Sequence, residues 1–177
     1  LSRKDPEYVG RAKEIQKAQK AIESGECAGK AVPEVAEIMG VVKKKFPEAS
    51  HENMGFGSTI FAVKPGDGSA REQAASCQKV LGGWANIAKE YATKRYRSNL
   101  INWGMLPFVI DKDFDFDNDD YVFIPGIKDA VKNKTEVIKA YVVNKDFAEI
   151  ELRLGELTDD ERQIITDGCL INYYKYN

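Results

Sequence analysis

The chain has 177 residues, with 26 Lys and Arg against 28 Asp and Glu and a formal net charge of −2. That length is enough for one domain with a substantial core, and the near-neutral charge argues against a dedicated nucleic-acid binder, which is normally strongly basic. The single histidine, His51, excludes a multi-histidine zinc site within the chain. We interpret His51 as an exposed loop residue.

The three cysteines, Cys27, Cys77 and Cys169, lie far apart in the sequence. An odd number without Cys-x-x-Cys spacing predicts neither a disulfide framework nor a closed zinc site, so we expect a reducing, cytoplasmic location. No stretch approaches the ~20 apolar residues of a membrane span, and we expect no membrane partner. Because the chain does not begin with Met, we expect it to be part of a longer protein.

The N-terminal part of the sequence predicts helices. Residues 5–7, Asp-Pro-Glu, have the chemistry of a helix start, with a capping Asp and a Pro in the first turn. Apolar residues at helical spacing continue over 8–22, and Gly25 can end that helix. A second helix is expected from Pro33 to the residue before Pro47. We therefore predict that residues 1–57 form a helical segment leading into the main domain.

The rest of the sequence alternates between strand and helix patterns. Apolar and charged residues alternate over 148–154, so we expect that strand near a sheet edge with one face in water. The order predicts a mixed α/β fold with one structural domain over residues 58–177. The expected elements are a strand at 59–63, a helix near 70–81, an apolar segment at 84–88, a helix around 91–103, strands at 106–110, 121–124, 137–143 and 148–154, and a closing helix after the capping box at 158–161.

Two charged segments suggest binding functions, but each also has a simpler structural interpretation. The acidic run at 111–120 lacks the Gly at position six and the Glu at position twelve of an EF-hand calcium loop, so we predict a solvated loop. The segment at 89–97 interleaves cations with tyrosines, as in some binders of single-stranded nucleic acid. With a net charge of −2, we predict instead an amphipathic helix with buried tyrosines and a charged outer face.

The segment at 64–73 predicts an anion site. It joins a short apolar strand to a helix through two glycines, with Ser69 and Arg71 where the helix begins. Unpaired backbone N–H groups, the positive end of the helix dipole and a guanidinium all favour a bound carboxylate. The same field would favour ionisation of Ser69, which could then act as a base or nucleophile without a histidine. A plain strand–turn–helix, with Ser69 as the N-cap and Arg71 on the surface, fits the pattern equally well.

This segment also carries a family resemblance. Residues 66–75, G-D-G-S-A-R-E-Q-A-A, resemble the G-x-G-S-S-R-E-H-A-A signature of the aconitase and isopropylmalate isomerase superfamily, which lies in its C-terminal swivel domain. The resemblance covers roughly residues 58–177. Further segments that resemble the family are 81–83, 87–89, 97–107 and, as in some monomeric aconitase-like hydratases, 159–174.

The resemblance implies a fold, an activity and partners. The fold would be the swivelling three-layer β/β/α domain at the C-terminus of an aconitase-like hydratase, with additional N- and C-terminal helices. The enzyme would be a hydro-lyase that dehydrates and rehydrates a hydroxy polycarboxylic acid such as citrate or isocitrate. Its 4Fe–4S cluster would be ligated outside this chain, by the remaining domains of the same enzyme, and none would be bound by this domain. We expect the isolated domain to be inactive.

The resemblance also implies roles for individual residues. Ser69 falls on the catalytic base, a serine alkoxide that removes and returns the carbon-bound proton of the substrate. Arg71 falls on the arginine that binds a substrate carboxylate, and Gly68 and Ala70 would line the substrate site.

The sequence departs from the family pattern at three places. Ala70 replaces a second serine that hydrogen-bonds the substrate, Gln73 replaces a histidine, and the segment at 89–100 is one residue longer. A further substrate arginine has no match within residues 1–58. These departures leave the substrate open. They also allow an alternative, a catalytically weakened paralogue with a binding or RNA-regulatory role.

Overall fold

The computed structural model describes residues 5–50 and 52–176, so His51 lies outside the described residues. The N-terminal part forms α1 (Tyr8–Glu23), α2 (Ala28–Ala31) and α3 (Pro33–Lys45), which confirms the two predicted helices and adds the short α2. The predicted Asp5 cap is wrong. No side chain caps α1, and the Asp5 carboxylate instead forms an ion pair with Arg11.

The described residues that follow form two three-stranded sheets. In the first sheet neighbouring strands are parallel, with α4 and α5 as the connections between them. In the second sheet neighbouring strands are antiparallel. The elements are β1 (Ser58–Ala62), α4 (Arg71–Val80), β2 (Gly83–Ala88), α5 (Lys94–Asn102), β3 (Leu106–Val109), β4 (Val122–Phe123), α6 (Ile127–Lys132), β5 (Ile138–Val142), β6 (Ala148–Leu152), α7 (Asp159–Asp167) and α8 (Leu170–Tyr176).

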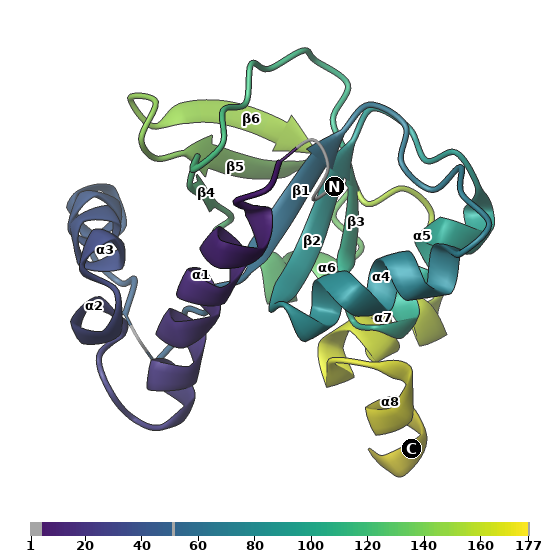
Figure 1. The fold of residues 1–177 in the computed structure, drawn as a ribbon, viewed down its shortest axis with the longest axis horizontal. Helices are drawn as coiled ribbons and strands as arrows, with labels where there is room; N and C mark the ends of the chain where they lie inside the picture. The colour runs from purple at the N-terminus through teal and green to yellow at the C-terminus, as the bar shows by residue number, and fades with distance from the viewer. Residues whose placement is uncertain (1–4, 51, 177) are drawn as a thin grey trace.

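The sheets and helices stack in layers. Ile87 and Phe108 of the parallel sheet share one buried cluster with Val142 and Leu152 of the antiparallel sheet. A second buried cluster, which contains Tyr96, joins α4 and α5. Figure 1 shows the antiparallel sheet and the pair α4–α5 on opposite sides of the parallel sheet. The arrangement is the predicted α/β fold with β/β/α layers.

The strand β6 lies at an edge, as its sequence pattern predicts. The strand order is β4-β5-β6, with Ile150 and Leu152 buried. Glu149 and Glu151 between them are exposed. Beyond β6, the Val109 N–H donates to the Arg153 carbonyl at 2.7 Å, so a short bridge links the two sheets.

Of the N-terminal helices, α3 packs against the antiparallel sheet, whereas α1 contacts α2 and β1. Val42 of α3 is buried with Val143 and Phe147, and the ring of Phe46 lies 5.5 Å from that of Tyr141. Figure 1 shows α2 and α3 on the side of the molecule away from α4 and α5. The predicted division of the chain between residues 57 and 58 stays a prediction.

The acidic run forms a loop, as predicted. The Lys145 ammonium lies 2.9 Å from an Asp117 oxygen and 3.2 Å from an Asp120 oxygen, so a cation from the chain itself occupies part of this acidic segment. Within the described residues, no helix combines the length and apolar character needed to cross a membrane.

Candidate functional site

The candidate site lies where β1 and β2 end. The loop after β1 and the loop after β2 run side by side, because Glu90 N–H donates to the Val63 carbonyl at 3.1 Å and Ala92 N–H to the Pro65 carbonyl at 2.9 Å. The carboxyl ends of parallel strands are where open α/β sheets bind ligands. The predicted anion segment therefore occupies the expected edge of the sheet.

Ser69 is exposed and does not cap α4. The N-cap position of this helix is Ala70, and no side chain provides a capping hydrogen bond. The interpretation of Ser69 as a structural cap is therefore wrong, and the residue is exposed to solvent. The first N–H groups of α4 have no carbonyl one turn earlier in the helix. Those donors and the positive end of the dipole favour an anion beside Ser69.

Arg71 is half-buried and anchored at one nitrogen. Its Nε donates a hydrogen bond to the Gly66 carbonyl at 3.2 Å. Within the described residues, no hydrogen bond or ion pair engages its two Nη groups. A guanidinium with this free edge can bind a carboxylate through two parallel hydrogen bonds.

Gly68 and Ala70 are both exposed, on the same loop as Ser69. A Cβ atom added at Gly68 would meet nothing within 4 Å, so there is open space beside it. The predicted site residues thus lie together on one open loop and at the first residue of α4. Their roles toward a substrate stay predictions.

A buried network behind the loop was missed from the sequence. The Tyr96 side chain is buried, and its hydroxyl accepts hydrogen bonds from Gln78 Nε2 at 2.9 Å and Asn86 Nδ2 at 2.8 Å. Tyr91 donates to the Phe108 carbonyl at 2.9 Å, and burial, followed by the neighbouring Tyr96, raises the pKa of Tyr91. Asn86, a polar residue within the apolar segment at 84–88, was the signal available in the sequence.

The basic and aromatic segment at 89–97 is largely engaged within the chain. Lys89 pairs with Asp113 at 2.7 Å, and Arg97 Nη2 donates to the Leu154 carbonyl at 2.8 Å. The predicted helix is confirmed only over residues 94–97, where Tyr96 of α5 is buried, whereas residues 89–93 form a loop in which Tyr91 is half-buried. The cations of this segment that stay exposed are Lys94 and Arg95.

The cysteines do not form a cluster site. Cys27 and Cys169 are half-buried, Cys77 is exposed, and none of the three forms a disulfide. An iron–sulfur cluster is normally held by several Cys thiolates. Among the described residues, no group of three or more His, Cys, Asp and Glu side chains could hold a metal ion. These residues do not fit a resident cluster.

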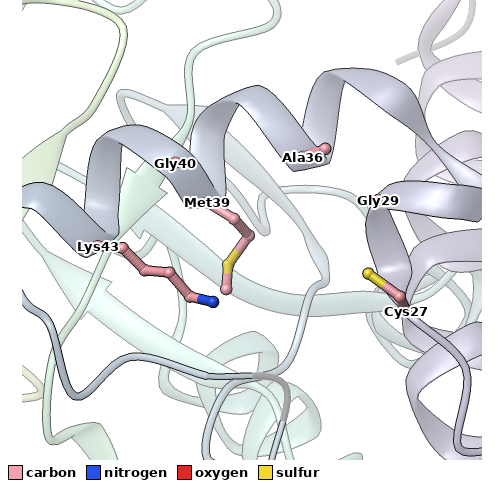
Figure 2. A pocket seen from close by; sticks show the side chains of 6 residues that line it. All are labelled: Cys27, Gly29, Ala36, Met39, Gly40 and Lys43. Carbon is pink, nitrogen blue, oxygen red and sulfur yellow. The ribbon is translucent and has the colours of Figure 1, made fainter.

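A separate hollow lies between α2 and α3, with a volume of about 210 Å³. Figure 2 shows Met39 and the Lys43 amine on one side of it and the Cys27 thiol on the other. It contains none of the predicted site residues and lies away from α4 and α5 (Figure 1). The residues that line it are Cys27, Gly29, Ala36, Met39, Gly40 and Lys43.

Comparison with known proteins gives consistent matches. Residues 13–113 match the model of the aconitase C-terminal domain family. Aconitate hydratase A of Rickettsia bellii is 31% identical over 132 residues, which are 70% of this chain and 15% of that protein. The methanogen homoaconitase small subunit of Methanocaldococcus jannaschii is 34% identical over 140 residues, which are 77% of this chain and 71% of that subunit.

A solved structure supports the same grouping. The 3-isopropylmalate dehydratase chain of Methanocaldococcus jannaschii matches with a TM-score of 0.52 and 27% identity, over 77% of this chain and 75% of that one. This confirms the predicted fold. The chain spans only 15% of the length of the R. bellii hydratase, but most of the length of the small subunit.

Proposed function

Because the chain belongs to the aconitase C-terminal domain family, we propose that it is the swivel-domain part of a hydro-lyase. The reaction would be the dehydration and rehydration of a hydroxy polycarboxylic acid. Citrate and isocitrate are one substrate pair. The homoaconitase and 3-isopropylmalate dehydratase relatives suggest longer or branched hydroxy acids as others.

One observation carries the proposal. An exposed serine without a capping role lies beside an uncapped helix start, and Arg71, with its free edge, is the first residue of that helix. A serine that stays neutral on a surface turn does not require positively charged or hydrogen-bond-donating groups around it. Here the helix dipole, the free N–H groups and the guanidinium all stabilise negative charge.

The proposed chemistry assigns separate tasks to the two side chains. Arg71 binds a carboxylate and so fixes the position of the substrate. Ser69, as the alkoxide, removes the proton from the carbon next to the departing hydroxyl and returns it during rehydration. The same positive surroundings that bind the substrate also favour the ionised serine.

The rest of the enzyme would complete the site. A 4Fe–4S cluster would supply the Lewis acid for the hydroxyl group, held by cysteines outside this chain. Both homoaconitase relatives are small subunits, so we propose a cluster-binding large subunit, or the equivalent domains, as the partner. The open face at Ser69 leaves room for that partner to close over the substrate.

A Ser69→Ala variant of the assembled enzyme tests the proposal. We expect turnover to fall by about 10²- to 10⁴-fold, because the general base is lost, while the cluster content and circular dichroism spectrum stay those of the wild type. Ser76→Ala is the matched control, because Ser76 lies on α4 and its hydroxyl donates to the Gln73 carbonyl. Survival of turnover in Ser69→Ala would show that the base is misassigned.

A second candidate function is binding without turnover. Ala70 puts a methyl group where the family has a substrate-binding serine, while Arg71 keeps its free edge. A paralogue of this kind would still bind polycarboxylates. An assembled wild-type protein without turnover, with calorimetric tricarboxylate binding that is weakened in Arg71→Lys, would favour this function.

A further inference from the structure

Gly66 is held in place by three contacts. Its carbonyl accepts a hydrogen bond from Arg71 Nε at 3.2 Å and another from the Thr93 hydroxyl at 3.3 Å. A Cβ atom at this position would lie 2.5 Å from Cγ of Tyr96, so the glycine sits directly against that ring. Both Thr93 and Tyr96 belong to the start of α5, which therefore fixes the peptide that anchors Arg71.

Thr93 uses its hydroxyl in two directions. The oxygen accepts a hydrogen bond from the Tyr96 backbone N–H at 3.2 Å, which caps α5. The proton is donated to the Gly66 carbonyl. A hydroxyl has one proton and two lone pairs, so the two bonds are compatible and together fix the side chain.

The start of α5 is itself rigid. Tyr96 is 3% exposed, and its hydroxyl receives hydrogen bonds from Gln78 of α4 and Asn86 of β2. Moving Tyr96 would leave buried polar groups without partners, which is costly. Thr93 therefore holds Gly66 against a fixed support.

This arrangement determines which edge of Arg71 is available. With Nε bound to Gly66, the edge formed by Nη1 and Nη2 remains for a carboxylate. An arginine already held by one nitrogen loses less rotamer freedom when it binds. We propose that Thr93 is a positioning residue, which acts through the Gly66 carbonyl to orient Arg71 so that a substrate carboxylate binds end-on. The inference rests on the proposed function, in which Arg71 is the carboxylate anchor.

Three variants of the assembled enzyme test the positioning role of Thr93. Thr93→Val keeps the shape of the side chain but cannot donate to Gly66, whereas Thr93→Ser keeps the hydroxyl. Thr158 caps α7 by accepting from Glu161 N–H at 3.2 Å, so Thr158→Val loses an equivalent cap away from Gly66. We expect KM for the polycarboxylate to rise about 2- to 10-fold in Thr93→Val with kcat unchanged, and wild-type values in the other two.

A double-mutant cycle separates positioning from general damage. Lysine has no counterpart of Nε–H, so Thr93→Val should add nothing to the KM increase caused by Arg71→Lys. Additive effects would overturn the inference. So would an unchanged KM in Thr93→Val when Arg71→Lys does raise KM.

NMR of the full chain tests the positioning without activity. The Arg71 Nε–H signal should report an ordered group in the wild type and in Thr93→Ser, and a mobile one in Thr93→Val. The same mobility in all three chains would show that the positioning is wrong. If Nε–H responds to Thr93 but Arg71→Lys leaves KM unchanged, the positioning stands and the proposed anchor role of Arg71 fails.

Discussion

At Gly66 the backbone adopts a φ of +95°, a conformation that glycine accepts and other residues rarely adopt. Tyr96 lies where a side chain would begin. Its own position is fixed by the amides of Gln78 and Asn86. The glycine that begins the family signature is thus required here for two separate physical reasons.

Gly66→Ala should therefore destabilise the chain strongly. We expect a loss of about 1–3 kcal/mol from backbone strain, and a further loss because the methyl group must displace Tyr96. Urea denaturation would measure it. Gly68→Ala is the control for stability, because Gly68 has no positive φ and no atom within 4 Å of an added Cβ. Equal stability losses in the two variants would contradict the packing described for Gly66.

The candidate site could be predicted from the sequence only where its residues are contiguous. Ser69 and Arg71 fall within one short motif, so their closeness at the start of α4 follows from the strand–turn–helix pattern. Thr93 reaches Gly66 across 27 residues, and no local pattern predicts such a contact. The N-cap at Ala70, in place of Ser69, depends on the exact residue at which α4 begins, which local propensity does not fix.

At the scale of elements, α4 and α5 are joined in two places near the site. Gln78 of α4 bonds to Tyr96 of α5, and the Trp103 indole at the end of α5 donates to Glu72 at 2.7 Å. The loop after β2 is held in turn by Tyr91, whose hydroxyl reaches the Phe108 carbonyl of β3. Polar side chains thus link the connections on this face of the parallel sheet.

The stabilisation by Tyr91 should depend on pH. Burial raises the pKa of Tyr91 in the folded chain, whereas an unfolded tyrosine has a pKa of about 10. The contribution of Tyr91 to the free energy of unfolding is therefore complete below about pH 10. It is lost as the pH rises further, because ionisation of the tyrosine then stabilises only the unfolded chain.

The Tyr91→Phe variant allows this pH dependence of stability to be measured. At pH 8 we expect the variant to be less stable by about 1–3 kcal/mol, because the carbonyl partner loses its donor. The difference in the free energy of unfolding from wild type should narrow between about pH 10 and 11, as wild type alone loses the tyrosine contribution. A difference that stays constant to pH 11 in urea denaturation would show that Tyr91 is not the group responsible.

The elements themselves could be predicted wherever the sequence pattern was strong. The capping box of α7 has both of its hydrogen bonds, from Thr158 and from Glu161, and β6 alternates as its sequence does. The short helices α6 and α8 were not predicted, because one or two turns give too little periodicity and tertiary packing decides them. The helix α5 begins at Lys94, later than expected, because Thr93 caps it.

At the scale of the whole molecule, the C-terminal helices dock through a close contact between glycines. A Cβ atom at Gly104, just after α5, would lie 1.9 Å from the Gly168 carbonyl oxygen at the end of α7. No side chain larger than hydrogen fits between these two backbones. The last two helices, at the lower right of Figure 1, therefore depend on one residue for their approach to α5.

Gly104→Ala should displace α7 and α8 from the body of the domain. We expect a loss of at least about 3 kcal/mol, since a backbone clash adds to the strain of a positive φ. Gly168→Ala is the matched control, because it has a similar positive φ but meets only the Asn172 amide, at 3.7 Å. Limited proteolysis should cut the C-terminal segment faster in the first variant. Similar cleavage rates in both would contradict the contact.

The uncapped start of α4 affects which substitutions at position 70 are compatible with the proposed site. An Asp or Asn at position 70 would satisfy the free N–H groups and stabilise the helix by about 1 kcal/mol. An Asp would also put a negative charge where a substrate carboxylate is proposed to bind. Selection for thermostability alone would thus favour substitutions at position 70 that block the proposed site. An alanine at this position keeps the helix end open at the expense of stability.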